Sequence, residues 1–333
     1  MSWERALQLA DAMPEDDPNR LTMRIAPRTL ICAHGYRIHT PIAGARFEEL
    51  QELCTTAGDK VSLAIGMAGV MGDLTTRGWH IHEPVELAFE LTGLLESIGD
   101  PTLTVGLAVS LMAIATITGD MAEMLRLSQI VIDLSDSDPA RGNFFVGTPL
   151  AYAYGSRSVA RWAQGQEGWR DDFHRALMMS RKTDPMSQAI GVVVTYGTAI
   201  QNGVVLADDV ALRDIQEAVD TAERSADDFA LGFALATMGV ALVERDSVAV
   251  ERGLQLLRQV REMSVGDRFY RVHLPFINAW IGRGLRGVAT ARGHCQCCAQ
   301  PTMICSLAGS LVIARPRPAS WCRNSWSTAM SLV

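Results

Sequence analysis

The chain has 333 residues, of which 48% are hydrophobic and 20% are charged, so a large buried core is expected rather than general disorder. The net charge of −7 argues against direct binding of nucleic acid, because such surfaces carry excess positive charge. The longest apolar run, Leu103 to Thr118, is shorter than the roughly 20 residues that a membrane-spanning helix needs. The polar start, Met1 to Arg5, predicts no secretory signal. We therefore expect a cytoplasmic protein that does not enter a membrane.

An aspartate followed by a helix-starting residue recurs along the chain. The successive spacings of this marker are 42, 41, 38, 46, 44 and 39 residues. In four of the seven instances the next residue is proline, which is favoured in the first turn of a helix, while aspartate caps the free N–H groups there. The pattern predicts a repeat of about 42 residues. The markers are Asp17, Asp59, Asp100, Asp138, Asp184, Asp228 and Asp267.

Between consecutive markers the pattern predicts two helices joined by a short turn. The first helix of each pair is apolar on most faces and the second is amphipathic, as expected for an inner helix covered by an outer one. We therefore predict an all-α fold over residues 1–285, an α-solenoid of about six to seven helical hairpins of the TPR-like kind. The predicted pairs include 61–76 with 84–98, 101–118 with 121–134, 185–206 with 210–225, and 228–243 with 248–263.

Glycines recur inside the predicted first helices. A glycine inside a helix costs about 1 kcal/mol relative to alanine, so its repeated use there predicts close approach between neighbouring helices. The positions are Gly66, Gly69, Gly106, Gly155, Gly191, Gly197, Gly232 and Gly239.

The end of the chain differs in composition from the rest. Residues 268–333 contain no Asp, Glu or Lys but hold eight Arg and five of the seven Cys, whereas the preceding residues carry all 37 acidic residues and 22 basic ones. Asp267 is followed by an expected first helix that reaches Trp280, and its partner should begin near residue 290. The sequence there has no helical period, so we interpret 286–333 as an irregular, disordered tail.

A frame error in the gene would account for this tail. Joining the third base of each codon to the first two of the next makes His294–Cys295 and Cys297–Cys298 encode Leu, and makes Met303–Ile304 encode Asp. With GC-rich choices elsewhere, residues 287–305 become a Gly-Asp turn and an amphipathic helix, the missing half of the repeat. We therefore predict a frameshifted tail, which the codon sequence over residues 280–333 tests.

Cysteine and histidine gather at two places, and neither matches a zinc site. The tail has the order Cys-x-Cys-Cys, whereas zinc sites pair a Cys-x2-Cys knuckle with a second, distant knuckle. In the body, His80 and His82 fall in a turn between predicted helices, where solvated side chains are expected. Cys32 and Cys54 are expected in the core. We predict no metal at either place; the residues are His294, Cys295, Cys297, Cys298 and Cys305, and Cys32, His34, His39, His80, His82 and Glu83.

The sequence contains no phosphate-binding loop and no nucleophile elbow. The paired carboxylates Asp171-Asp172 and Asp208-Asp209 fall at predicted helix starts, where the helix dipole favours negative charge. One aromatic group has two interpretations, a concave binding surface or anchoring in the core, of which anchoring is favoured. We assign no catalytic, cofactor-binding or metal-binding residue and predict no cofactor. The aromatic group is Tyr152, Tyr154, Trp162 and Trp169 with Arg170.

Three segments of the body resemble the C-terminal helical-repeat region of large actinobacterial signalling proteins. Those proteins join a class III adenylate/guanylate cyclase domain to an AAA/STAND-type ATPase and then to the repeats, and some relatives are LuxR-type regulators. The resemblance covers about residues 1–285 and stops at the tail. The segments are 53–69 (LCTTAGDKVSLAIGMAG), 94–107 (LLESIGDPTLTVGL) and 222–232 (AERSADDFALG).

The resemblance implies a non-enzymatic regulatory module that binds a protein partner, or the cyclase and ATPase domains of related proteins. The cyclase aspartates and the ATPase phosphate loop have no counterpart here, so we expect a truncated fragment of such a protein. Two alternatives remain open: a gene remnant without a function of its own, and a nucleotide-handling enzyme. Aggregation that is cured by ending the chain near Asp267 would favour the remnant, and turnover of ATP or GTP would favour the enzyme.

Overall fold

The computed structural model describes residues 2–35, 42–77, 82–181, 183–246 and 248–291. These residues form helices and no strand, so the predicted all-α class is confirmed. The helices are α1 Ser2–Asp11, α2 Arg20–His34, α3 Ile42–Ala57, α4 Lys60–Arg77, α5 His82–Ile98, α6 Pro101–Thr118, α7 Met121–Leu134, α8 Pro149–Ala163, α9 Trp169–Ser180, α10 Pro185–Val192, the π-helix Val193–Gly197, α11 Thr198–Gln201, α12 Asp209–Ser225, α13 Asp228–Arg245, α14 Val250–Val265, the 3₁₀-helix Arg271–His273 and α15 Leu274–Ala291.

Three of the seven aspartate markers cap a helix as predicted. The side chains of Asp59, Asp100 and Asp184 accept hydrogen bonds of 2.8–3.0 Å from backbone N–H groups in the first turns of α4, α6 and α10. At the sixth marker the cap is Asp227 rather than Asp228, which is already the first residue of α13. The sequence pattern therefore located this helix start to within one residue.

The other three markers do not cap a helix. Asp17 accepts a 2.8 Å hydrogen bond from the N–H of Asn19 in the turn before α2. Asp138 lies in the long connection between α7 and α8, and Thr148 caps α8 instead. Asp267 has a left-handed backbone conformation, with φ of 58°, before the 3₁₀-helix. Asp17 and Asp138 accept hydrogen bonds within turns, and the next α-helices after the three markers start at Arg20, Pro149 and Leu274.

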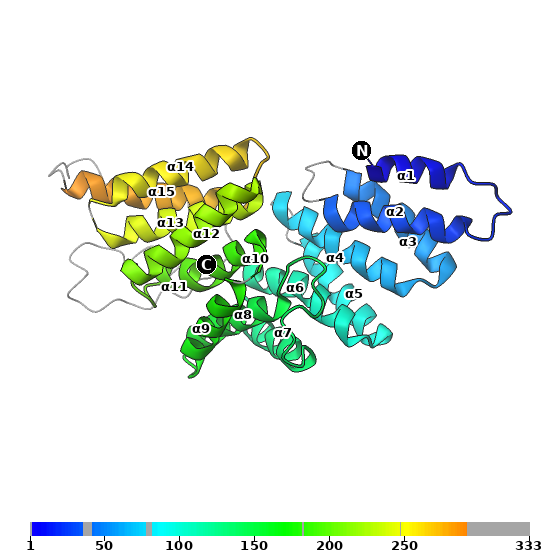
Figure 1. Cartoon of the computed structure of the whole chain (residues 1–333), viewed down its shortest axis with the longest axis horizontal. Coiled ribbons are helices and arrows are strands. Elements are labelled where there is room, and N and C mark those ends of the chain that lie inside the picture. The colour runs from blue at the N-terminus through cyan, green and yellow to red at the C-terminus, as the bar shows by residue number, and fades with distance from the viewer. Residues whose placement is uncertain (1, 36–41, 78–81, 182, 247, 292–333) are drawn as a thin grey trace.

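The helices follow one another along the long axis of the molecule (Figure 1). In that view α1–α5 and α12–α15 lie at opposite ends, with α6–α9 between them. Most helices contact their neighbours in sequence, and α12 contacts α10. In addition, α2, α4, α6, α8, the α10–α11 segment, α13 and α15 contact one another in series. Of these, α4, α6, the α10–α11 segment and α13 correspond to segments predicted as first helices of a pair.

Helix α6 is the most apolar part of this core. It is long and apolar enough, by composition alone, to cross a membrane, but 56% of it is buried inside the protein. It contacts α4, α5, α7 and α8. Burial on several sides by other helices is the profile of a core helix, which agrees with the predicted buried helix. The length of α6 alone does not support that prediction, because its 18 residues meet the length of a membrane span.

Glycines permit the closest approaches between elements, as predicted. A Cβ atom on Gly69 of α4 would overlap the backbone of α2 at Cys32 and Ala33. A Cβ atom on Gly106 of α6 would overlap the ring of Phe144, which lies in the connection before α8. Both overlaps are with atoms that cannot move aside cheaply, so these positions need glycine for packing.

The predicted helix over 185–206 is interrupted and shorter. A π-helix over Val193–Gly197 follows α10, and α11 ends at Gln201. The wider π turn places the side chain of Val194 against Gly155 of α8 and the hydroxyl of Tyr196 2.7 Å from Oδ2 of Asp214 on α12. These contacts come from distant parts of the chain, so the local pattern did not predict the interruption.

The last described helix, α15, continues beyond the predicted end of the helical domain at residue 285. It begins at Leu274, after the 3₁₀-helix, and ends at Ala291 rather than near Trp280. Of the predicted tail over 286–333, residues 286–291 belong to α15 and are not irregular, whereas 292–333 lie outside the described residues. The interpretation of the tail as a frameshifted segment stays a prediction.

Candidate functional site

A polar pocket of about 400 Å³ lies among α1, α2 and α3. Charged side chains dominate its lining, and one leucine supplies an apolar wall. Its lining contains no histidine, cysteine or lysine. The lining residues are Asp11, Arg24, Arg28, Arg46, Glu49, Glu52, Leu53 and Thr56.

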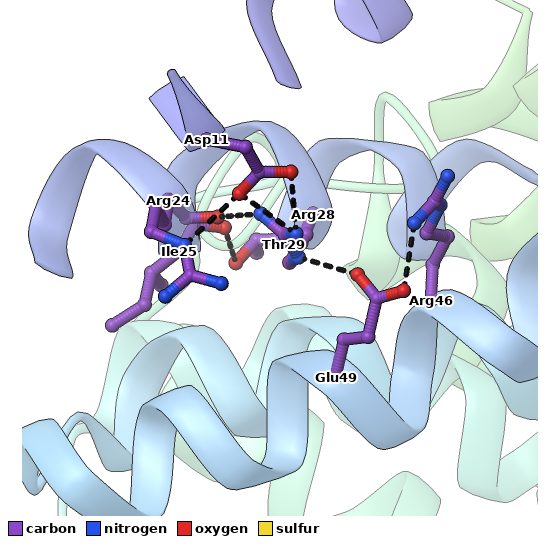
Figure 2. Close-up of polar contacts among 7 residues, drawn as sticks. All are labelled: Asp11, Arg24, Ile25, Arg28, Thr29, Arg46 and Glu49. Carbon is purple, nitrogen blue, oxygen red and sulfur yellow. Dashed lines mark hydrogen bonds and ion pairs between the residues drawn. The ribbon is translucent and has the colours of Figure 1, made fainter. Parts of the chain in front are cut away.

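Arg28 is the centre of the pocket's hydrogen-bond network (Figure 2). Its side chain is only 3% exposed, yet all of its guanidinium nitrogens donate hydrogen bonds. Nη2 lies 3.0 and 2.9 Å from the two carboxylate oxygens of Asp11, and Nε lies 2.9 Å from Oε2 of Glu49. Nη1 donates to the carbonyl oxygen of Arg24 at 3.1 Å. A buried guanidinium is tolerated here because its donors are paired.

Two further arginines extend the network at its ends. Nε of Arg24 donates to Oδ1 of Asp11 at 2.9 Å, and Nη1 of Arg46 donates to Oε1 of Glu49 at 2.7 Å. The result is an alternating series, Arg24–Asp11–Arg28–Glu49–Arg46, drawn in Figure 2. Three guanidinium groups face two carboxylates, so the series carries one excess positive charge.

The charges of the network stabilise one another. Burial by itself would raise the pKa of Asp11, but hydrogen bonds from Arg28 and Arg24 outweigh it and lower the pKa below the ordinary value of 3.8. Burial would likewise lower the pKa of Arg28, whereas hydrogen bonds to Asp11 and Glu49 outweigh burial and raise it above its ordinary value. These groups are therefore ionised at neutral pH, and the pocket offers charged hydrogen-bonding groups suited to recognition.

A second charged cluster lies in the core between α8 and α9. The carboxylate of Asp172, 2% exposed, accepts hydrogen bonds from Arg157 at 2.6 and 2.8 Å and from Arg161 at 2.7 Å. Its predicted position at a helix start is confirmed, because it lies in the first turn of α9. The sequence did not predict that it is also a buried partner of two arginines, whereas the neighbouring Asp171 is exposed.

The other predicted carboxylate pair agrees with its interpretation. Asp208 caps α12, accepting hydrogen bonds of 3.0 and 2.9 Å from the N–H groups of Val210 and Ala211. Asp209, in the first turn, pairs with Arg245 at the end of α13 at 2.6 Å. Asp208 therefore stabilises the start of α12, and Asp209 stabilises a contact between neighbouring helices.

The aromatic group around Tyr154 belongs mainly to the core. Tyr154 is 9% exposed, and the guanidinium of Arg157 lies 5.2 Å from its ring centre. Trp169 packs against the core edge-on to Phe173, with ring centres 6.4 Å apart, and Arg170 lies over its outer face at 4.3 Å. Anchoring in the core, the favoured interpretation, is thus correct for Tyr154 and Trp169.

The described cysteine residues of the body share one core cluster, and the described histidines lie elsewhere. Cys32 and Cys54 are buried, and burial raises the pKa of their thiols to about 12 and about 11. His34 stacks on Trp3 with ring centres 5.4 Å apart, and His82 is exposed at the start of α5. Within the described ranges no group of three or more potential metal ligands gathers. His39, His80 and the tail cluster from His294 to Cys305 lie outside those ranges.

Sequence reasoning missed the polar pocket. A signal was present, since Arg24 and Arg28 are four residues apart on one helix face and Arg28 falls within the apolar stripe that contains Ile25 and Cys32. An arginine in such a stripe requires buried partners. Its partners come from α1 and α3, which the sequence pattern does not identify.

Comparison of the chain with protein-family models, with curated proteins and with solved structures finds no match.

Proposed function

We propose that this chain is a non-catalytic helical-repeat module, an α-solenoid that binds a protein partner in signalling. The observation that supports this most directly is the regular recurrence of contacts between successive hairpins. Polar contacts join residues that are 36 to 43 positions apart, about one predicted repeat, along most of the chain. They are Lys60–Ser97, Arg141–Thr102, Gly147–Ser187, Gln164–Met121, Arg245–Asp209, Arg268–Asp228 and Arg283–Glu244.

Repetition of this kind favours a binding role on physical grounds. Each hairpin buries its apolar surface against the next one, so the array is extended and exposes a large area relative to its core. Solenoids commonly use such extended surfaces to bind other proteins. The resemblance of segments 53–69, 94–107 and 222–232 to the repeat region of actinobacterial cyclase–ATPase proteins identifies cyclase and ATPase domains as the partners to test first.

Binding is best tested with purified domains. Class III cyclase domains and STAND-type ATPase domains from actinobacterial relatives would be titrated into the full chain by isothermal titration calorimetry. Saturable binding to either domain supports the proposal. Binding to neither domain, together with turnover of ATP or GTP by the chain alone, would replace it with the enzymatic alternative.

A further inference from the structure

Helix α15 packs against fewer helices than the others in its series. We call the serially contacting helices inner helices and the helices between them in sequence outer helices. Each inner helix from α2 to α13 contacts one outer helix before it and one after it. α15 continues the inner series through its contact with α13, but among the outer helices of the described residues it packs against α14 alone. The outer helices are α1 and α3 for α2, α3 and α5 for α4, α5 and α7 for α6, α7 and α9 for α8, α9 and α12 for α10, and α12 and α14 for α13.

The exposed face of α15 differs from the exposed face of an outer helix. Asn278, Ala279, Leu285 and Arg286 each lie three or four residues from Gly282, so these five residues form one stripe along the helix. Arg286 is the one charged member, and Leu285 is 47% exposed. Small and apolar residues on such a stripe are typical of a helix that packs against another one. By contrast, α14 exposes the charged residues Glu251, Arg252, Arg258, Arg261 and Glu262.

Gly282 leaves an open notch in this stripe. Other glycines of the inner helices receive leucines of outer helices. A Cβ atom on Gly239 of α13 would lie 2.8 Å from Cγ of Leu257 on α14, the outer helix that follows. A Cβ atom on Gly284, on the buried side of α15, would lie 2.8 Å from Cδ2 of Leu254 on the same α14. A Cβ atom on Gly282 would meet no atom within 4 Å among the described residues. The notch therefore has the form that elsewhere receives an outer-helix side chain.

The charge of this part of the chain indicates the chemistry of an occupant. Residues 250–291, which include α14 and α15, hold seven arginines and three acidic residues, whereas residues 1–249 hold 34 acidic and 19 basic residues. A second α15 would repeat the same positive charge. Residues 292–333 add four arginines and no acidic residue. An acidic helix is complementary in charge to this basic surface, and neither of those two occupants is.

We propose that the exposed face of α15, formed by Asn278, Ala279, Gly282, Leu285 and Arg286, binds an acidic amphipathic helix of a protein partner. The bound helix takes the place of a following outer helix. An apolar side chain of the partner inserts at Gly282 beside Leu285, and its acidic residues lie toward Arg286. The proposal rests on the proposed function, because it names the surface and the partner chemistry through which the module binds.

The full chain is tested with two peptides taken from its own outer helices. The probe has the sequence of α12, residues 209–225, which is amphipathic and holds five acidic and two basic residues. The control has the sequence of α14, residues 250–265, which is also amphipathic but holds two acidic and three basic residues. Fluorescence anisotropy of the labelled, acetylated and amidated peptides measures affinity, and amide signals of glycine-labelled protein locate the site. The α12 peptide is expected to bind saturably and to shift the Gly282 signal, with an affinity about tenfold higher than that of the α14 peptide.

Substitutions test whether the peptide uses the notch. Gly282→Leu fills the notch and has open space for the new side chain in the free protein, so it should leave the fold intact while weakening peptide binding at least about tenfold. Leu285→Ser removes apolar contact area and should weaken binding about fivefold. Gly93→Leu is the matched control, because Gly93 on the exposed face of α5 also has no atom within 4 Å of an added Cβ. Thermal unfolding of each variant checks that the fold is retained.

The outcomes separate this surface from the proposed function. The proposal is overturned if the α12 peptide does not bind saturably or if Gly282→Leu leaves its affinity unchanged. Equal affinity for the two peptides overturns the acidic chemistry of the partner. Self-association of the chain in sedimentation experiments that Gly282→Leu abolishes assigns the face to a second copy instead. Binding of a cyclase or ATPase domain that is unaffected by Gly282→Leu would support the module while overturning this surface. Peptide binding at Gly282 without binding of either domain would support this surface and remove those domains as its partner.

Discussion

Both carboxylate oxygens of Asp172 on α9 accept hydrogen bonds from Arg157 on α8, at 2.8 Å from Nε and 2.6 Å from Nη2. The remaining side of the same guanidinium donates from Nη1 to Oε1 of Gln129 on α7 at 2.8 Å. One arginine thus joins three successive helices. Arg161 donates a further hydrogen bond to Asp172, so a single buried carboxylate pairs with two guanidinium groups.

Removing this buried carboxylate charge should destabilise the protein strongly. In Asp172→Asn, Arg157 and Arg161 lose their counter-charge inside the core, which is expected to lower the free energy of unfolding by about 3 kcal/mol. Asp171→Asn is the matched control at the exposed neighbouring position and should change it by less than about 0.5 kcal/mol. Urea unfolding followed by circular dichroism measures both. Equal effects of the two substitutions would mean that the buried cluster contributes no more than a surface charge.

A glycine substitution tests the close approach of α4 to α2. Gly69→Ala introduces a Cβ atom that overlaps the backbone of α2, so a loss of about 1–3 kcal/mol is expected. Gly93 of α5 has open space around the same atom, and Gly93→Ala should instead stabilise the protein by about 0.5–1 kcal/mol through helix propensity. The two variants are compared by thermal and urea unfolding, and a stabilising effect of Gly69→Ala would contradict the packing described.

The aspartate markers differ in what they stabilise, and this difference is measurable. Asp100→Ala removes the cap that accepts two hydrogen bonds at the start of α6, and should cost about 1 kcal/mol. Asp138→Ala removes one hydrogen bond to the N–H of Ala140 in a turn, and a smaller loss, below about 0.5 kcal/mol, is expected. Unfolding in urea gives both values. A larger cost for Asp138→Ala would mean that the connection before α8 depends on this turn more than α6 depends on its cap.

Much of the fold could be predicted from the sequence because helix starts and apolar periodicity are local signals. The predicted helix over 121–134 matches α7 at both ends, and the one over 210–225 differs from α12 by one residue. The π-helix over Val193–Gly197 was not predicted because it depends on two contacts with other helices. One is the packing of Val194 against Gly155, and the other is the hydrogen bond from Tyr196 to Asp214. Local patterns determine which segments are helical, whereas contacts between helices determine how regular each one is.

The pocket was harder to predict than the helices. The contacts of Arg28 with Asp11 and Glu49 join residues 17 and 21 positions apart on three helices, and the sequence gives no spacing rule for such ion pairs. The burial of Asp172 was not predicted for the same reason. Its place in the first turn of α9 was correct, but its burial depends on α8 packing over it. Charged residues that contact two helices at once can be identified only from the tertiary structure.

His273 lies in the 3₁₀-helix before α15. Its ring stacks on Phe269 with centres 5.5 Å apart, and it contacts the edge of Phe233 at 5.7 Å. The side chain is partly exposed, and its partial removal from water among these rings lowers the pKa of His273 from 6.5 to about 4. The nearby charges on the same segment are those of Arg271 and Asp267, which pair with each other.

Acid should therefore destabilise the fold through His273. Because its pKa is lower in the folded state than in the unfolded state, the unfolded state binds a proton first, and stability is lost as the pH falls from about 6.5 to about 4. One such group contributes a slope of about 1.4 kcal/mol per pH unit over that range. His273→Phe keeps an aromatic ring without a titrating group and should flatten the pH dependence of the urea-unfolding free energy by that amount. His174→Phe, at an exposed position of α9, should retain the wild-type slope. Identical slopes for wild type and His273→Phe would mean that the histidine is hydrated in the folded protein and is not a source of acid sensitivity.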